Sequence, residues 1–154
     1  MSLRRTWWSL ALLVAVAAPA QGQRALSVWL GVGSPISHDS ITFARDQVEA
    51  YGALQLDLPL LPFALRGDVS IAGGDLRDGT RNAIASAVFP LRLPLVQPYA
   101  MVGYGTYDWG KSFEHRGASY GAGVRVQFGG LGAFVQARRH EHLDRTIATL
   151  GLVF

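Results

Sequence analysis

Hydrophobic and polar side chains alternate along most of this sequence from residue 25 onward. Successive side chains of a β-strand point to opposite faces, so alternation with a period of two residues indicates strands. In the first such segment Leu26, Val28 and Leu30 share one face, and Ser27 and Trp29 share the other. The pattern predicts eight strands, at Ala25–Gly33, Gln47–Leu58, Phe63–Ala72, Arg81–Leu91, Pro98–Asp108, Ala118–Phe128, Leu131–His140 and Arg145–Phe154.

The predicted connections alternate between longer and shorter segments. The first two strands are joined by a polar 13-residue loop, Ser34–Asp46, whereas Pro59–Pro62 and Gly129–Gly130 are tight turns. Pro90, Pro94 and Pro98 leave the limits of the fourth and fifth strands open, because proline has no N–H to donate to a ladder. The tight turns predict the pairing of Phe128 with Leu131, Gln127 with Gly132, Arg125 with Phe134, Gly121 with Arg138, Asp57 with Ala64 and Gln55 with Arg66.

Alternation alone leaves open which face meets water. In a soluble sandwich or lipocalin-like barrel the apolar face is inside, whereas in an outer-membrane barrel it faces lipid. The strand lengths suit a tilted crossing of the membrane, the strand number is even, and short turns at one end face longer loops at the other. These features predict an all-β fold, an eight-stranded antiparallel up-and-down transmembrane β-barrel. In the alternative, a soluble periplasmic β-barrel that binds an apolar ligand, Leu26, Leu54, Val69 and Val124 line a cavity.

The interior of an eight-stranded barrel is just wide enough to be filled by side chains. The polar face is rich in small residues and carries a few charges, which we expect to form a polar network in the lumen: Glu49, Asp57, Arg66, Asp68, Arg125 and Arg138. Asp57 and Arg66 are diagonal neighbours in the predicted register and are expected to form a salt bridge. Aromatic residues near the strand ends are expected to form interfacial girdles: Phe63, Phe89, Tyr99, Tyr107, Trp109 and Phe128.

The first 20 residues have the layout of a secretory signal peptide. Arg4 and Arg5 precede an apolar run of 11 residues, Trp7–Ala17, and Ala18-Pro19-Ala20 offers small residues for cleavage. A membrane-spanning helix needs about 20 apolar residues, which is longer than this run. We therefore expect residues 1–20 to be a cleaved signal peptide and residues 21–154 to be the barrel.

Several of these segments resemble the outer-membrane β-barrel superfamily, and within it the small eight-stranded barrels of the OmpA and OmpX type. The segments that carry the resemblance are Leu95–Gly110, Ser119–Gly130, Gly132–His140 and Thr149–Phe154. The resemblance implies a location in the cell outer membrane after export, with outer-membrane lipid as a partner and a monomeric state. It also implies that Leu150, Leu152 and Phe154 form the C-terminal signal that the barrel-assembly machinery reads.

Composition narrows the possible functions. The 154 residues are 49% hydrophobic and 16% charged, with 14 basic and 11 acidic side chains and no cysteine. Disulfides, thiolate metal sites and a cysteine nucleophile are therefore excluded. No basic run or stripe remains beyond the signal segment, so a nucleic-acid partner is not expected, and no cofactor is indicated.

Residues of the predicted last hairpin suggest two possible activities, lipid A deacylation and metal binding. One family of lipid A deacylases, which are also outer-membrane barrels, has a His-x-Ser pair near the end of the penultimate strand. Here His140 is present, but His142 occupies the position of the serine nucleophile. His140, His142 and Asp144 are also of the type that binds a metal, although a polar loop explains them more simply. The sequence favours a structural or surface-interaction role without catalysis, and a lipid A-modifying enzyme remains an alternative.

Overall fold

The computed structural model describes residues 25–37, 40–41, 48–58, 61–73, 79–110 and 114–154. These residues contain nine strands: β1 (Leu26–Ser37), β2 (Ser40–Ile41), β3 (Glu49–Asp57), β4 (Ala64–Ala72), β5 (Thr80–Pro90), β6 (Val96–Tyr107), β7 (His115–Phe128), β8 (Leu131–His140) and β9 (Arg145–Val153). No helix in this part of the chain is long and apolar enough to cross a membrane. The expected signal peptide, residues 1–20, lies outside the described residues.

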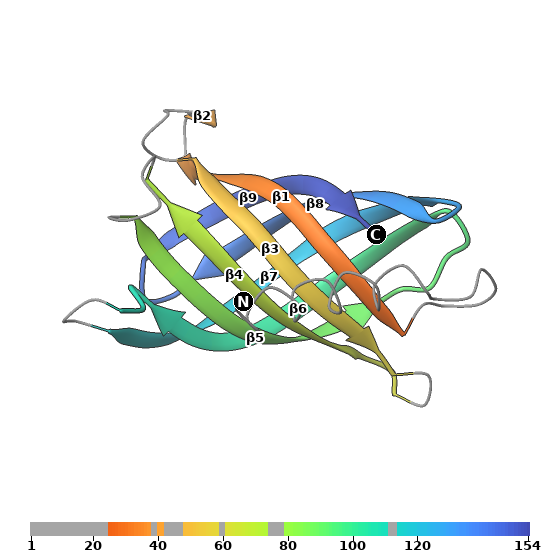
Figure 1. Cartoon of the computed structure of the whole chain (residues 1–154), viewed down its shortest axis with the longest axis horizontal. Coiled ribbons are helices and arrows are strands. Elements are labelled where there is room, and N and C mark those ends of the chain that lie inside the picture. The colour runs from red at the N-terminus through yellow and green to blue at the C-terminus, as the bar shows by residue number, and fades with distance from the viewer. Residues whose placement is uncertain (1–24, 38–39, 42–47, 59–60, 74–78, 111–113) are drawn as a thin grey trace, which may run out of the picture.

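Eight of the nine strands close into a barrel wall (Figure 1). Each wall strand pairs antiparallel with the next along the chain, and β9 pairs with β1 to complete the ring. The short β2 is an extension that pairs only with the end of β1, through Ile36 with Ile41 and Ser37 with Ser40. The prediction of an eight-stranded antiparallel up-and-down barrel is confirmed.

The two ends of the barrel differ in their connections. We call the end that carries the β3–β4, β5–β6 and β7–β8 connections the turn end, and the opposite end the loop end. At the turn end Gly129 has a φ of 60°, in the left-handed region that favours glycine. The predicted registers are confirmed, since Phe128 pairs with Leu131 and Gln55 pairs with Arg66.

Three strands extend further than the alternation indicated. β1 continues through Ser37, although Ser34 to Ser37 were expected to begin a loop. Pro35 fits in this extension because it lies opposite Ile147 of β9, beyond the last rung that β1 shares with β3. β6 and β7 likewise start earlier than predicted, at Val96 and His115, because each supplies the other with backbone partners along 12 rungs.

The apolar face of the wall is outside and the mixed face is inside. Leu54 and Val69 are 55% and 52% exposed, whereas Arg66 and Trp29 are 2% and 1% exposed. The alternative in which Leu26, Leu54, Val69 and Val124 line a ligand cavity is wrong, because these side chains lie on the outer surface. A soluble barrel buries its apolar face, and this barrel does the reverse.

A close approach of backbones at the seam between β1 and β9 requires glycine. A Cβ atom placed on Gly151 would lie 2.0 Å from the carbonyl oxygen of Leu30, and one on Gly31 would lie 2.5 Å from that of Leu150. Neither distance is compatible with a side chain. The two glycines, which lie opposite each other, therefore allow the last strand to meet the first.

Candidate functional site in the barrel lumen

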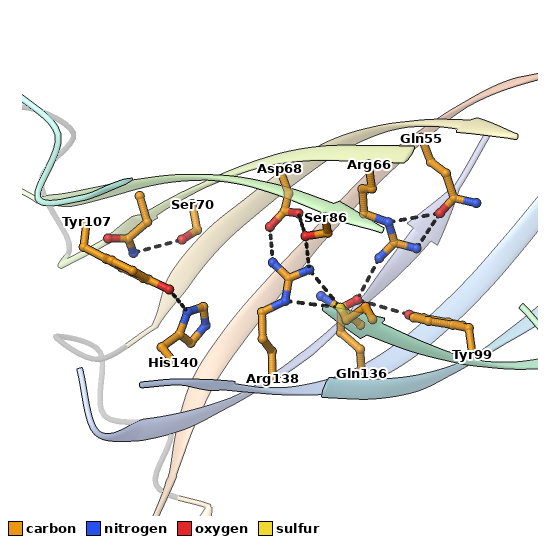
Figure 2. Close-up of polar contacts among 12 residues, drawn as sticks. Gln55, Arg66, Asp68, Ser70, Ser86, Tyr99, Tyr107, Gln136, Arg138 and His140 are labelled. Carbon is orange, nitrogen blue, oxygen red and sulfur yellow. Dashed lines mark hydrogen bonds and ion pairs between the residues drawn. The ribbon is translucent and has the colours of Figure 1, made fainter. Parts of the chain in front are cut away.

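Inward-facing polar side chains from β3, β4, β5 and β8 meet across the lumen and form separate groups of polar contacts along it (Figure 2). They are brought together because every second residue of each strand points inward, and the registers align those positions on neighbouring strands. Most of these groups are buried: Gln55, Arg66, Asp68, Ser86, Gln136 and Arg138 are each 5% exposed or less.

The centre of the network is an ion pair between Asp68 of β4 and Arg138 of β8. The Arg138 guanidinium also donates to the Ser86 hydroxyl at 3.1 Å and contacts the Met101 sulfur at 2.8 Å. Ser86 in turn donates to the other Asp68 carboxylate oxygen at 3.4 Å. A charge buried this deeply is stable only when it is paired, and here three strands, β4, β5 and β6, supply the partners of Arg138.

Arg66 occupies the lumen on the turn-end side of this ion pair. Its guanidinium donates to Gln55 at 2.6 and 3.0 Å and to Gln136 at 3.0 Å. It also lies 3.8 Å from the ring centroid of Trp29 and 5.1 Å from that of Tyr99. Cation–π contacts of this kind are strongest where water is excluded. Arg66 is thus held by amide oxygens and aromatic faces.

The expected salt bridge between Asp57 and Arg66 is wrong. Gln55 lies between the two groups: its side-chain nitrogen donates to both Asp57 carboxylate oxygens, at 3.1 and 3.2 Å, and its oxygen accepts from Arg66. Gln55 shares the inward face with Asp57 and lies directly opposite Arg66, whereas Asp57 is one rung further toward the turn end on that face. The amide therefore reaches the guanidinium first.

The other expected members of the network lie away from its centre. Glu49 is 4% exposed at the loop end, opposite Gly33 and Ala72. Arg125 is near the turn end, where it donates to Gln97 and borders a small cavity of about 80 Å³. The structure thus brings Asp68 and Arg138 into contact but separates the remaining charged groups.

Sequence reasoning did not include the neutral residues that complete the network. Gln55, Gln136 and Ser86 satisfy the two buried arginines, and Trp29 stacks on Arg66. Their membership of the polar face was visible in the alternation. The predicted register placed Gln55 opposite Arg66, but it did not show that Gln136 is the other partner, because Arg66 and Gln136 are 70 residues apart in the chain.

Two of the six residues expected in the aromatic girdles are not there. Tyr99 and Tyr107 are 5% and 0% exposed and point into the lumen, where Tyr99 donates to Gln136 at 3.1 Å. A position near a strand end does not by itself place an aromatic side chain in a girdle, because alternate residues of a strand face inward and outward. Trp109 lies beyond the end of β6 and is 57% exposed. Phe89 and Phe128 are 46% and 70% exposed, and half-buried Phe63 packs against Phe89 with ring centroids 5.9 Å apart.

A histidine cluster lies at the loop end. His140 is 5% exposed and faces the lumen, where its Nδ1 lies 3.0 Å from the Tyr107 hydroxyl. The rings of His115 and His142 are stacked, with centroids 4.3 Å apart. Among the described residues, no group of three or more histidine and carboxylate side chains is arranged to hold a metal ion.

Comparison with solved structures identifies the fold of small transmembrane barrels. The crystal structure of the N-terminal β-barrel domain of OprF from Pseudomonas aeruginosa superposes with a TM-score of 0.64 at 17% identity, covering 87% of this chain and 98% of that one. A de novo designed transmembrane β-barrel superposes with a TM-score of 0.57 at 16% identity, covering 88% and 98%. No protein-family model and no curated protein sequence matches the chain.

Proposed function

We propose that this chain is an integral outer-membrane β-barrel protein with a lumen filled by side chains, and that its role is structural or in surface interactions. The observation that carries the proposal is the distribution of polarity across the wall. Each of the eight wall strands places at least one large apolar side chain on the outside, 46–55% exposed: Leu30, Leu54, Val69, Phe89, Val102, Tyr120, Val135 and Leu150. Such a continuous apolar belt is costly in water and favourable in lipid.

The outward-facing charges support the same proposal. In the wall strands that the structure describes, the outward positions carry three charged residues, Arg81, Arg116 and Arg139. All three lie in the loop-end part of their strands, and the rest of the outer wall is apolar or small. In bacterial barrels the longer loops are extracellular, so the arginines would lie at the level of the outer-leaflet headgroups.

The lumen argues against bulk transport. Its middle is occupied by the Asp68–Arg138 pair and by Arg66 between Trp29 and Tyr99. Wide aqueous channels belong to barrels with about 16 to 18 strands. The proposed partners are outer-membrane lipid and, through outward-facing Leu150, Leu152 and Phe154, the barrel-assembly machinery.

The lipid A-modifying alternative depends on His140. The ring is turned into the lumen, and Ser119, which lies opposite it on β7, is 1% exposed. A catalytic pair would need to reach a lipid on the outer surface, so this geometry favours the structural role. Loss of lipid A modification in cells with a His140→Ala substitution, measured by mass spectrometry of extracted lipid A, would support the enzyme instead.

The test of the proposed function is the mobility of the protein in SDS gels, unboiled and boiled, from cell fractions. A closed barrel keeps its hydrogen-bonded wall in detergent until it is heated, so we expect a heat-dependent shift in the outer-membrane fraction. Val69→Arg, on the lipid-facing surface, should lower the fraction of the protein that shows this shift, whereas Val69→Ala should leave that fraction unchanged. A single band in the soluble periplasm would overturn the proposal.

A further inference from the structure

The outer wall is hollowed on the flank formed by β4, β5 and β6, which lie side by side (Figure 1). A groove of about 490 Å³ runs over these strands. Its floor consists of small outward-facing residues, among them Gly67, Ala83 and Ala85, and larger residues, Val69 and Tyr104, rise beside them, 52% and 61% exposed. The groove is therefore apolar and open to the surroundings of the barrel.

A second groove continues the first toward the turn end. It has a volume of about 520 Å³, shares Gly67 and Ala85 with the first, and passes between Leu54 and Leu65. From Val69 to Leu65 the chain of β4 advances by four residues, which is roughly 13 Å. That length is close to half of the approximately 30 Å hydrocarbon thickness of a bilayer, so the two grooves together suit an acyl chain of one leaflet.

A positive charge lies at the loop end of this path. Arg116 of β7 borders the first groove and lies opposite Thr106, which in turn lies opposite Ala83. Arg116 is exposed, and none of the described carboxylates forms an ion pair with it. Asp68 also borders the groove, but its carboxylate is turned into the lumen and paired with Arg138. Within the part of the chain that the structure describes, the groove therefore ends on a guanidinium that no carboxylate pairs.

Arginine suits a phosphate particularly well, because its planar guanidinium matches two phosphate oxygens. At the loop end, Arg116 lies where the headgroups of the outer leaflet would be, and the exposed Tyr104 is of the type enriched at that interface. Of the other two outward-facing arginines, Arg139 is already paired with Asp144, and Arg81 of β5 does not border the groove. The charge of Arg116 and the length of the apolar groove thus indicate a ligand with an acyl chain and a phosphate.

We propose that the flank of β4, β5 and β6 binds one acylated lipid whose headgroup carries a phosphate and a net negative charge. The acyl chain lies over Gly67 and Ala85, and the phosphate contacts Arg116. The inference rests on the proposed function, because the groove meets lipid only if the barrel lies in a membrane. It adds to that function a specific lipid site on one side of the wall.

The test is native mass spectrometry of the full chain refolded in detergent, with barrel closure checked first by the heat-dependent gel shift. The probes are anionic dimyristoyl phosphatidylglycerol and zwitterionic dimyristoyl phosphatidylcholine, which have the same acyl chains. Both contain a phosphate, but in phosphatidylcholine the choline cation neutralises it. We expect one phosphatidylglycerol to bind about fivefold more tightly, the ratio that corresponds to about 1 kcal/mol for one arginine beside an anionic lipid. Inorganic phosphate at the same concentration should not displace it, because phosphate has no acyl chain.

Two variants separate the two halves of the site. Arg116→Gln should reduce phosphatidylglycerol binding to the phosphatidylcholine level. Gly67→Leu should weaken the binding of both lipids, and it should fold, because no atom lies within 4 Å of the Cβ position. The matched controls are Arg139→Gln for the charge and Ala133→Leu for the groove; Ala133 is exposed on β8 and borders neither groove.

The outcomes are distinguishable. Loss of the preference in Arg116→Gln, with both controls unchanged, supports the lipid site. A closed barrel that binds the two lipids equally, or in which both site variants bind like the unmodified chain, overturns the lipid site and leaves the proposed function intact. Displacement by inorganic phosphate also overturns it. A chain that never shows the gel shift overturns the proposed function and the lipid site together.

Discussion

The buried ion pair between Asp68 and Arg138 permits a quantitative test of the lumen. Arg138 is 3% exposed, and its other partners, Ser86 and Met101, carry no charge. Replacing Asp68 with leucine therefore leaves a buried guanidinium without a counter-charge. Removal of one partner of a buried pair costs about 3–5 kcal/mol, whereas replacing both partners with apolar residues is often neutral. We expect Asp68→Leu and Arg138→Met each to lose about 3–5 kcal/mol, and the double variant to lose far less than their sum.

The measurement is reversible urea unfolding in phospholipid vesicles, followed by tryptophan fluorescence, for the two single variants and the double variant. Trp29 lies in the lumen and reports directly on its packing. The control is Arg139→Met, because the Arg139–Asp144 pair has side chains 39% and 87% exposed and such pairs contribute about 0–1 kcal/mol. Single-variant losses below about 1 kcal/mol, or losses that simply add in the double variant, would refute the reasoning about the buried pair.

Three other substitutions test separate parts of the fold. Leu54→Arg on the lipid-facing surface should lower the free energy of unfolding in vesicles by about 2–4 kcal/mol. If this surface faced water, the loss measured by urea unfolding would be less than about 1 kcal/mol. Gly151→Ala should prevent closure of the barrel, because its Cβ would lie 2.0 Å from a carbonyl oxygen of β1. The control is Gly67→Ala, whose Cβ meets nothing within 4 Å. Equal gel shifts for the two variants would contradict this account of the seam. Arg66→Lys should lower the urea midpoint of unfolding, because the compact ammonium group of lysine cannot both donate to two glutamines and stack on Trp29. An unchanged midpoint would show that a positive charge is sufficient at position 66.

The alternation of side chains predicted most of the wall. A period of two residues depends only on local backbone geometry, so it indicates strands wherever they pair. The turn at Gly129 and Gly130 predicted the register of β7 with β8 correctly, because a slip of one residue would move every side chain to the wrong face. The extension of β1 through Ser37 was missed, because its pairing with β9 involves residues more than 100 positions away in the sequence.

The details of the lumen required the closed ring. Arg66 and Tyr99 illustrate why: Arg66 was assigned to Asp57 across one hairpin, and Tyr99 to a girdle from its place near a strand end, yet both reach Gln136 on a strand that is not their neighbour. Arg66 reaches Gln136 on β8, and Tyr99 is turned inward to the same amide. A side chain inside a barrel meets residues from the opposite wall, and the distance to that wall depends on the number and the tilt of the strands.

The alternation along the chain indicated that it forms strands, how neighbouring strands pair, and which residues share a face. These properties follow from interactions between residues that are close in the chain. The closed fold was needed to show that Asp68 meets Arg138 and that a groove ends at Arg116, and it confirmed that the apolar face lies outside. Closure of β9 onto β1 brings distant positions together, so the partners of a buried charge depend on that closure.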